Sequence, residues 1–312
     1  MEIKTFLNRF SKKSTTLQPL QIKQGMKRTH LLYTGLLILI FAACKKEYSL
    51  ENSGNLNNQF IVGADCRTSK IAYIDSPTNV GLGSIAANIN LFDQATQITQ
   101  FDSLSATIDF QANMVYVSDT IYINPDEYFI FDILTKRIKR LHGLIDPTNP
   151  GSAQFDADYI YSVGGYLLQK TYSLTAFPGF PFYLVDYGYD GNGNMIHMNS
   201  FEMSTGDLVS DADMTYYPNI KPRSNLYIFP DELSYSQYNQ FFNFGLRPTN
   251  AVKNYKVRYY DPGNVLRDST VSLFKTYNMS RDNYILNVVM LGDDQFSIPA
   301  RASKLVFSYK CK

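Results

Sequence analysis

Histidine is the side chain that most often acts as a catalytic base near neutral pH, and this chain has three histidines. His30 lies in an N-terminal segment that we expect to be removed, which leaves His142 and His197. Neither is accompanied by a G-x-S-x-G elbow or a cysteine and histidine constellation, and two histidines are too few for a histidine-rich metal site. We predict that both are surface or turn residues. The sequence therefore gives no catalytic residue, no metal ligand and no cofactor.

Carboxylates offer two further kinds of chemistry. The run from Asp190 to Asn194 (DGNGN) alternates oxygen-bearing side chains as calcium loops do, but Met195 and Phe201 stand where an EF-hand loop needs glycine and glutamate. We predict a hairpin turn there, and weak calcium binding by another geometry stays open. A glycosidase uses two carboxyl groups across a cleft, which spacing cannot identify. Asp126 and Glu127 are candidates in name only, since Asn-Pro-Asp126 is typical of a turn.

A segment with two prolines and three phenylalanines runs from Phe177 to Phe182 (FPGFPF). Exposed aromatic rings can stack on sugar rings or anchor a protein partner. The alternative is a loop whose rings cover the end of the sheet. Phe177, Phe180 and Phe182 are the candidate binding residues.

Cys44 follows a pattern that signal peptidases recognise. Lys27 and Arg28 come first, an apolar run extends from Leu31 to Phe41, and two alanines precede the cysteine. This order resembles the lipobox, in which the cysteine is diacylated and becomes the new N-terminus. The apolar run is shorter than the about 20 residues that span a membrane. We therefore predict residues 1–43 as the signal region, with translation starting at Met26, and a lipid on Cys44 that binds the membrane.

Removal of residues 1–43 takes away seven basic residues and one acidic residue, which leaves 22 against 27 and a formal net charge of −5. A mildly acidic chain lacks the basic surface that phosphate backbones require, so we expect no nucleic-acid partner. Residues 44–59 are polar and predict a lipid-anchored flexible tether. Lys45, Lys46 and Glu47 fit a charged signal for export to the outer face of the outer membrane, and a solvated linker has the same composition.

Two more cysteines, Cys66 and Cys311, stand near the two ends of the remaining chain. In an oxidising compartment such a pair can form a disulfide. Two free thiols are the alternative, because the sequence does not show whether the Cα atoms come within about 7 Å. Neither cysteine belongs to a C-x-x-C motif.

Residues 60–312 are rich in tyrosine and phenylalanine, with turn-forming Asp, Asn and Gly between them. Apolar and polar residues alternate in 107–117, 183–189, 255–260 and 304–309, and the one helical pattern, Asp231 to Asn243, is short. A recurring unit of an aromatic residue, a polar residue, a turn and a returning strand is clearest at 161–167, 189–196 and 260–266. We predict one all-β domain, a large curved antiparallel sheet or open barrel built as a meander of hairpins.

Tyr189-Asp190-Gly-Asn-Gly-Asn194 and Tyr260-Asp261-Pro-Gly-Asn264 resemble the YD repeats of β-rich bacterial surface proteins. Together with 159–168 and 216–250, they resemble a Bacteroidetes lipoprotein family of unknown function. That resemblance implies a porin-like antiparallel sheet and no established catalytic residues.

Two functional hypotheses follow. The first is a non-catalytic, surface-exposed lipoprotein of the outer membrane that binds a ligand, glycan or envelope protein, or has a structural role. The second is a hydrolase of extracellular polymers with paired carboxylates, which requires a pocket holding two carboxyl groups about 5 to 10 Å apart.

Overall fold

The computed structural model describes residues 66–146, 149, 151–228, 238–292 and 304–311. The predicted signal region, Cys44 and the tether lie outside these residues. The described chain is all-β, with seventeen strands in one sheet. They are β1 (Cys66–Asp75), β2 (Val80–Ile89), β3 (Ala95–Asp102), β4 (Thr107–Asn113), β5 (Val115–Val117), β6 (Thr120–Asn124), β7 (Glu127–Phe131), β8 (Ile138–Leu144), β9 (Gln154–Tyr161), β10 (Leu167–Leu174), β11 (Pro181–Tyr189), β12 (Met195–Glu202), β13 (Leu208–Tyr216), β14 (Val252–Asp261), β15 (Val265–Met279), β16 (Ile285–Leu291) and β17 (Lys304–Cys311).

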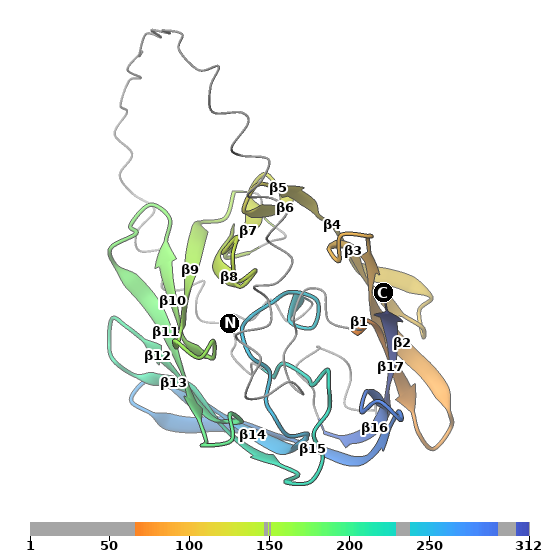
Figure 1. Ribbon diagram of the computed structural model, residues 1–312. Helices are drawn as coiled ribbons and strands as arrows, with labels where there is room; N and C mark the ends of the chain where they lie inside the picture. The colour runs from red at the N-terminus through yellow and green to blue at the C-terminus, as the bar shows by residue number, and fades with distance from the viewer. Residues whose placement is uncertain (1–65, 147–148, 150, 229–237, 293–303, 312) are drawn as a thin grey trace, which may run out of the picture. The chain divides into compact units, whose positions relative to one another are not determined.

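The strands follow one another around the sheet in chain order, and every pairing is antiparallel. β1 pairs with both β2 and β17, so the first and last strands are neighbours. β4 pairs with β3 and β5 pairs with β6, while Met114 joins β4 to β5 and donates its N–H to the carbonyl of Thr96 at 2.9 Å. The result is a nearly closed ring of hairpins, as Figure 1 shows. The predicted fold class is confirmed.

The apolar positions of the strands face the inside of the ring. Ile71, Phe129, Val185 and Val288 are fully buried, as the alternating patterns of their strands require. The chain between β13 and β14 supplies the rest of the core. We call its described residues, 217–228 and 238–251, the plug segment, and Figure 1 shows it inside the ring of strands.

The plug segment is bonded to the hairpin turns at one end of the ring, which we call the plug end. Leu246 donates its N–H to the carbonyl of Gly165 at 2.9 Å, and Ile138 donates to the carbonyl of Asn243 at 2.8 Å. Arg223 donates to the carbonyl of Asn283 at 2.8 Å. Because the turns come from hairpins far apart in sequence, the plug segment ties the plug end together.

Four turns at the plug end are built alike. The first residue, an Asn, Ser or Asp, donates its N–H to the carbonyl of the fifth residue, and its side-chain oxygen accepts the N–H of that residue. The fourth residue has a positive φ, which Gly, Asn and Asp adopt most readily. The turns are 90–94, 162–166, 190–194 and 280–284. The hairpins predicted at 161–167, 189–196 and 260–266 are all present.

Tyrosine hydroxyls connect neighbouring strands by hydrogen bonds at the plug end. The hydroxyl of Tyr216 donates to the carbonyl of Met195 at 2.6 Å, and that of Tyr309 donates to the carbonyl of Ile285 at 2.7 Å. Burial raises the pKa of both phenols well above its usual range. The hydroxyl thus satisfies a strand-end carbonyl while the ring adds apolar area.

The outward face of the sheet carries paired polar side chains beside exposed apolar ones such as Ile108, Ile160 and Val271. Polar and charged side chains on neighbouring strands form hydrogen bonds and ion pairs across the strands, which stabilises the sheet. Within the described ranges, no helix has the length and apolarity that a membrane crossing needs. The cross-strand pairs of the outward face include Arg140 with Asp158, Gln169 with Asp186, His197 with Asp213, and Arg258 with Asp211 and Asp213.

The short helix expected at 231–243 falls partly outside the described residues. Tyr238 has a 3₁₀-helical conformation and the residues after it form turns, with Phe241 and Phe242 donating their N–H groups to the carbonyl of Tyr238. Its aromatic spacing, which suggested a helix, serves to pack rings around Phe129.

Candidate functional site

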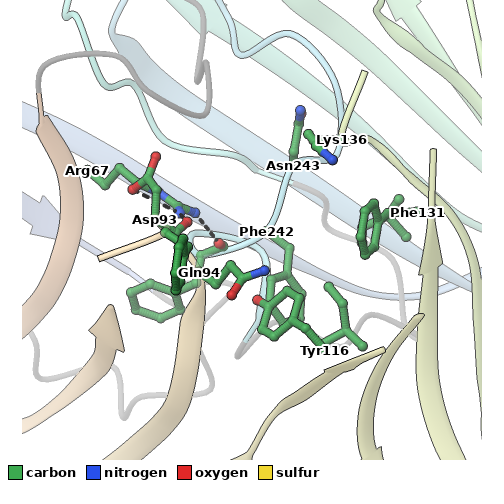
Figure 2. Close-up of a pocket in the computed structure, with 12 residues that line it drawn as sticks. Arg67, Asp93, Gln94, Tyr116, Phe131, Lys136, Phe242 and Asn243 are labelled. Carbon is green, nitrogen blue, oxygen red and sulfur yellow. Dashed lines mark hydrogen bonds and ion pairs between the residues drawn. The ribbon is translucent and has the colours of Figure 1, made fainter. Parts of the chain in front are cut away.

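A cavity of about 190 Å³ lies at the plug end, between the turn at 90–94, the turn at 132–137 and the plug segment. Figure 2 shows the ion pair of Arg67 and Asp93 on one side and Phe131 on the other. Phe92 is 79 % exposed, so it stands at the mouth, whereas Arg67 and Ile138 are buried. Small-molecule sites usually exceed about 300 Å³, so this cavity suits one ring of a larger ligand.

Arg67 is the buried charge of the site. Its guanidinium lies 3.2 Å from the Asp93 carboxylate, donates to the Asp93 carbonyl, and donates to the carbonyl of Phe241 at 2.8 Å. Burial lowers the pKa of Arg67, and Asp93 opposes that shift. The pair therefore joins β1, the turn at 90–94 and the plug segment, and it fixes one wall of the cavity.

Aromatic rings form much of the remaining lining. Phe131 and Phe242 come from β7 and the plug segment, and Tyr116 comes from β5. The hydroxyl of Tyr116 donates to the carbonyl of Ala95 at 3.0 Å, and burial raises its pKa. Flat apolar faces next to polar groups are suited to stacking on a sugar or another planar ring.

Lys136 is the second cation in the lining. Its Nζ lies 5.4 Å from the centre of the Phe131 ring, a cation–π arrangement. Lys136 has a φ of 58° at the fifth position of the turn at 132–137, in which it donates its N–H to the carbonyl of Asp132. Gln94 and Asn243 add amide groups close by. A ligand with a ring and an anionic substituent meets complementary groups here.

The chemistry available to the cavity is limited. Among the described residues that line it, Asp93 is the one carboxylate, and it is held by Arg67. A glycosidase needs two carboxyl groups. No three histidine, cysteine or acidic side chains of the described residues gather closely enough to hold a metal ion. The arrangement can bind and orient a ligand.

Cys66 and Cys311, for which the sequence left two states open, form a disulfide in this structure. They face each other in the ladder between β1 and β17. The bond spans 245 positions and joins the two ends of the described chain at the plug end. Cys66 directly precedes Arg67 in β1, so the disulfide fixes the strand that carries this lining residue.

The predicted aromatic loop lies at the opposite end of the ring, which we call the far end, in the turn between β10 and β11. Phe177 and Phe180 are 51 % and 77 % exposed. Phe182, in β11, packs against the core and lies 6.5 Å from Tyr172 between ring centres. The loop and the cavity are therefore separate places, and Phe182 does not share the exposure of the other two phenylalanines.

The run at 190–194 forms the predicted turn. Asp190 accepts the N–H groups of Asn192 and Asn194 at 2.9 and 2.8 Å and the side-chain amide of Asn194 at 3.0 Å. Burial works to raise the pKa of Asp190, but these hydrogen bonds outweigh burial and lower it. The carboxylate oxygens are thus used within the turn.

The two histidines differ from each other. His197 is partly exposed and lies 3.0 Å from Asp213. His142, expected at the surface, is instead 6 % exposed, because Tyr128 stacks on its ring at 4.6 Å and Asp156 binds Nδ1 at 2.9 Å. The surface prediction for His142 is wrong. Neither residue lines the cavity.

The cavity residues themselves were not identified from the sequence, because they come from five strands (β1, β5, β6, β7 and β8), two turns and the plug segment. One signal was present in the chain: Phe92-Asp93 belongs to the recurring aromatic and polar turn unit. The partner of Asp93, Arg67, lies 26 positions away, and no local pattern links them.

Comparisons with known proteins agree with this fold. No protein-family model matches the chain, and the search of curated proteins finds no match. The chain is similar in structure to a porin-like protein from Bacteroides uniformis ATCC 8492, with 10 % identity and a TM-score of 0.53, over 78 % of this chain and 98 % of that chain. A porin-like protein from Bacteroides vulgatus ATCC 8482 gives 13 % identity and a TM-score of 0.47, over 79 % and 99 %. At such identity the first likeness shows the fold alone, and it agrees with the porin-like sheet that the sequence resemblance implied.

Proposed function

We propose that this chain is a lipid-anchored, non-catalytic protein of the outer membrane that binds an acidic sugar of an envelope glycan in the cavity at the plug end. One observation carries the proposal: the ring of Phe131 lies beside the ammonium group of Lys136 in a cavity the size of one ring, which Phe92 also lines. Stacking would hold the sugar ring, and Lys136 would pair with its carboxylate. The sequence resemblance to a Bacteroidetes lipoprotein family with YD-repeat-like hairpins supports the lipid-anchored envelope part of the proposal.

Hydrolysis is not part of this proposal. Asp93 is the carboxylate among the described lining residues, and it is paired with Arg67. Breaking this ion pair would leave the buried charge of Arg67 uncompensated. A second carboxylate at the distance that sugar hydrolysis requires is not among the described lining residues.

Titration calorimetry with glucuronate, and with glucose as the neutral probe, tests the cavity. Glucuronate should bind more tightly than glucose. Phe92→Ser and Lys136→Gln should each weaken glucuronate binding by about fivefold, since each removes about 1 kcal/mol of stacking or charge pairing. Phe180→Ser, an equally exposed phenylalanine at the far end, is the matched control and should bind as the unchanged protein does. If neither probe binds, the proposed ligand is wrong.

The lipid anchor has its own test. A fatty-acid probe should label the full chain in cells, and Cys44→Ala should abolish the label, because the order of basic, apolar and small residues before Cys44 is what the processing enzymes read. A Cys44→Ala chain that still labels and still floats with membranes would contradict the anchor.

A further inference from the structure

The two ends of the ring carry opposite charge. Near the far-end turns the described residues include ten carboxylates and two cations. Near the plug-end turns they include eight cations and four carboxylates, apart from the buried residues Arg67, Asp93 and Arg247. The far-end carboxylates are Asp75, Asp102, Asp109, Asp126, Glu127, Asp146, Glu202, Asp207, Asp261 and Asp268, and the far-end cations are Arg267 and Lys304. The plug-end cations are Lys136, Arg137, Lys139, Lys221, Arg223, Lys253, Arg281 and Lys310, and the plug-end carboxylates are Asp119, Asp132, Asp190 and Asp282.

Large apolar side chains project from the tips of three plug-end hairpins. Leu91, Leu134 and Val163 are 94 %, 81 % and 106 % exposed, and Phe92 and Ile133 are beside them. The turn at 132–137 combines such a tip with three nearby cations. Apolar side chains next to lysine and arginine are typical of surfaces that enter the headgroup layer of a membrane.

The described chain begins and ends at the plug end. β1 begins at Cys66, at the plug end, and Cys44 precedes it by 22 positions. The outward face of the sheet carries paired charges between its strands, such as Arg140 with Asp158, whereas the cations near the plug-end turns lie beside exposed apolar tips. The apolar tips of the far end, such as Phe180, stand among carboxylates, which an anionic surface repels.

We propose that the plug end docks on an anionic lipid bilayer, with the tips of the turns at 90–94, 132–137 and 162–166 in the headgroup layer and the far end directed away. This inference rests on the proposed lipid anchor at Cys44 for its biological setting. The docking itself depends on the tips and cations alone. It sets the mouth of the cavity, at Phe92, close to sugars that are carried on lipid.

The chain contains no tryptophan, so one introduced indole gives an unambiguous fluorescence signal. Leu134→Trp places it at a plug-end tip, and Phe180→Trp is the matched control, since Phe180 is 77 % exposed at a far-end tip. Both variants are made in the full chain, with and without Cys44→Ala, and mixed with phosphatidylglycerol vesicles that contain brominated lipid. Circular dichroism checks that both fold.

Emission from Leu134→Trp should shift to shorter wavelength and lose at least half its intensity, while emission from Phe180→Trp stays unchanged. Lys136→Gln with Lys139→Gln, or vesicles of phosphatidylcholine, should weaken the quenching several-fold. Quenching of Phe180→Trp, or of neither indole, would overturn the proposed docking. A fatty-acid label that persists in the Cys44→Ala background, with quenching of Leu134→Trp retained, would refute the anchor and leave the docking intact.

Discussion

Asn194 and Asn250 bind each other through two reciprocal hydrogen bonds, although 56 positions separate them in the chain. Asn250 donates its N–H to Oδ1 of Asn194 at 2.8 Å, and Nδ2 of Asn194 donates to Oδ1 of Asn250 at 3.1 Å. The side chain of Asn250 also donates to the carbonyls of Tyr217 and Pro218. One asparagine ends a hairpin turn and the other ends the plug segment, so their contact attaches the plug segment to the ring.

Replacing either asparagine should destabilise the fold. Both residues are less than 5 % exposed, so Asn194→Ala or Asn250→Ala leaves buried hydrogen-bonding groups without partners, at a cost of about 1–3 kcal/mol in the free energy of unfolding. Urea unfolding of the two single variants and the double variant measures this. Because the residues share bonds, the double variant should lose less than the sum of the singles. Exact additivity would show that the pair is not coupled.

The disulfide between Cys66 and Cys311 should stabilise the ring. It joins β1 to β17, and removal of such a bond typically costs about 2–5 kcal/mol. The double variant Cys66→Ser with Cys311→Ser should therefore melt at a lower temperature than the unchanged protein. A reductant should lower the melting temperature of the unchanged protein to that of the variant and leave the variant unaffected. A reductant that changes neither protein would contradict the stabilising role.

Stability should fall in acid partly through Asp190. Its hydrogen bonds lower its pKa in the folded protein, so the ionised form favours folding. This contribution is present above the unfolded pKa of about 3.9 and is lost as the pH falls through the folded value. The difference in unfolding free energy between pH 7 and pH 3 should be smaller in Asp190→Asn than in the unchanged protein. Asp282→Asn, an exposed aspartate of the similar turn at 280–284, should keep the full difference.

Calcium should leave the protein unchanged. The oxygens of Asp190 already accept three hydrogen bonds from Asn192 and Asn194, and a bound cation would have to replace them. A thermal melt at increasing calcium concentration should give a constant melting temperature. A saturable rise would mean that the folded protein binds calcium, and its absence in Asp190→Ala would locate the site.

Local patterns predicted the strands well and the site poorly, for one physical reason. Alternation at 183–189 and 255–260 reflects which face of a strand is buried, and that information is contained in neighbouring residues. The turn at 190–194 was equally visible, because positive φ selects Gly and Asn locally. Hairpins in chain order then give the ring without further information.

The cavity depends on contacts between distant segments. Arg67 and Asp93 are 26 positions apart, and Arg67 meets Phe241 across 174 positions. In the sequence Arg67 has no feature that separates it from the other arginines. The plug segment shows the same limit. Its aromatic spacing resembles that of a short helix, whereas the side chains of Tyr238 and Phe242 pack against Phe129 of β7. Tertiary packing decided what local propensity could not.

The three phenylalanines between Phe177 and Phe182 differ in exposure, so packing and binding can be tested separately in this far-end segment. Phe177 and Phe180 are exposed, whereas Phe182 packs against the core near Tyr172. The double variant Phe177→Ser with Phe180→Ser should therefore keep its unfolding free energy within about 0.5 kcal/mol, and Phe182→Ser should lose about 1–3 kcal/mol. Urea unfolding compares the three proteins.

Retention on envelope polysaccharides and on envelope protein extracts then tests the function of this loop. If the loop binds a partner, the double variant should be retained less than the unchanged protein, because both exposed rings are lost while the fold remains. Phe182→Ser, measured at a temperature where it is fully folded, is the control and should be retained as before. Equal retention of all three proteins would exclude Phe177 and Phe180 from binding and leave the cavity beside Arg67 and Asp93 as the candidate recognition site.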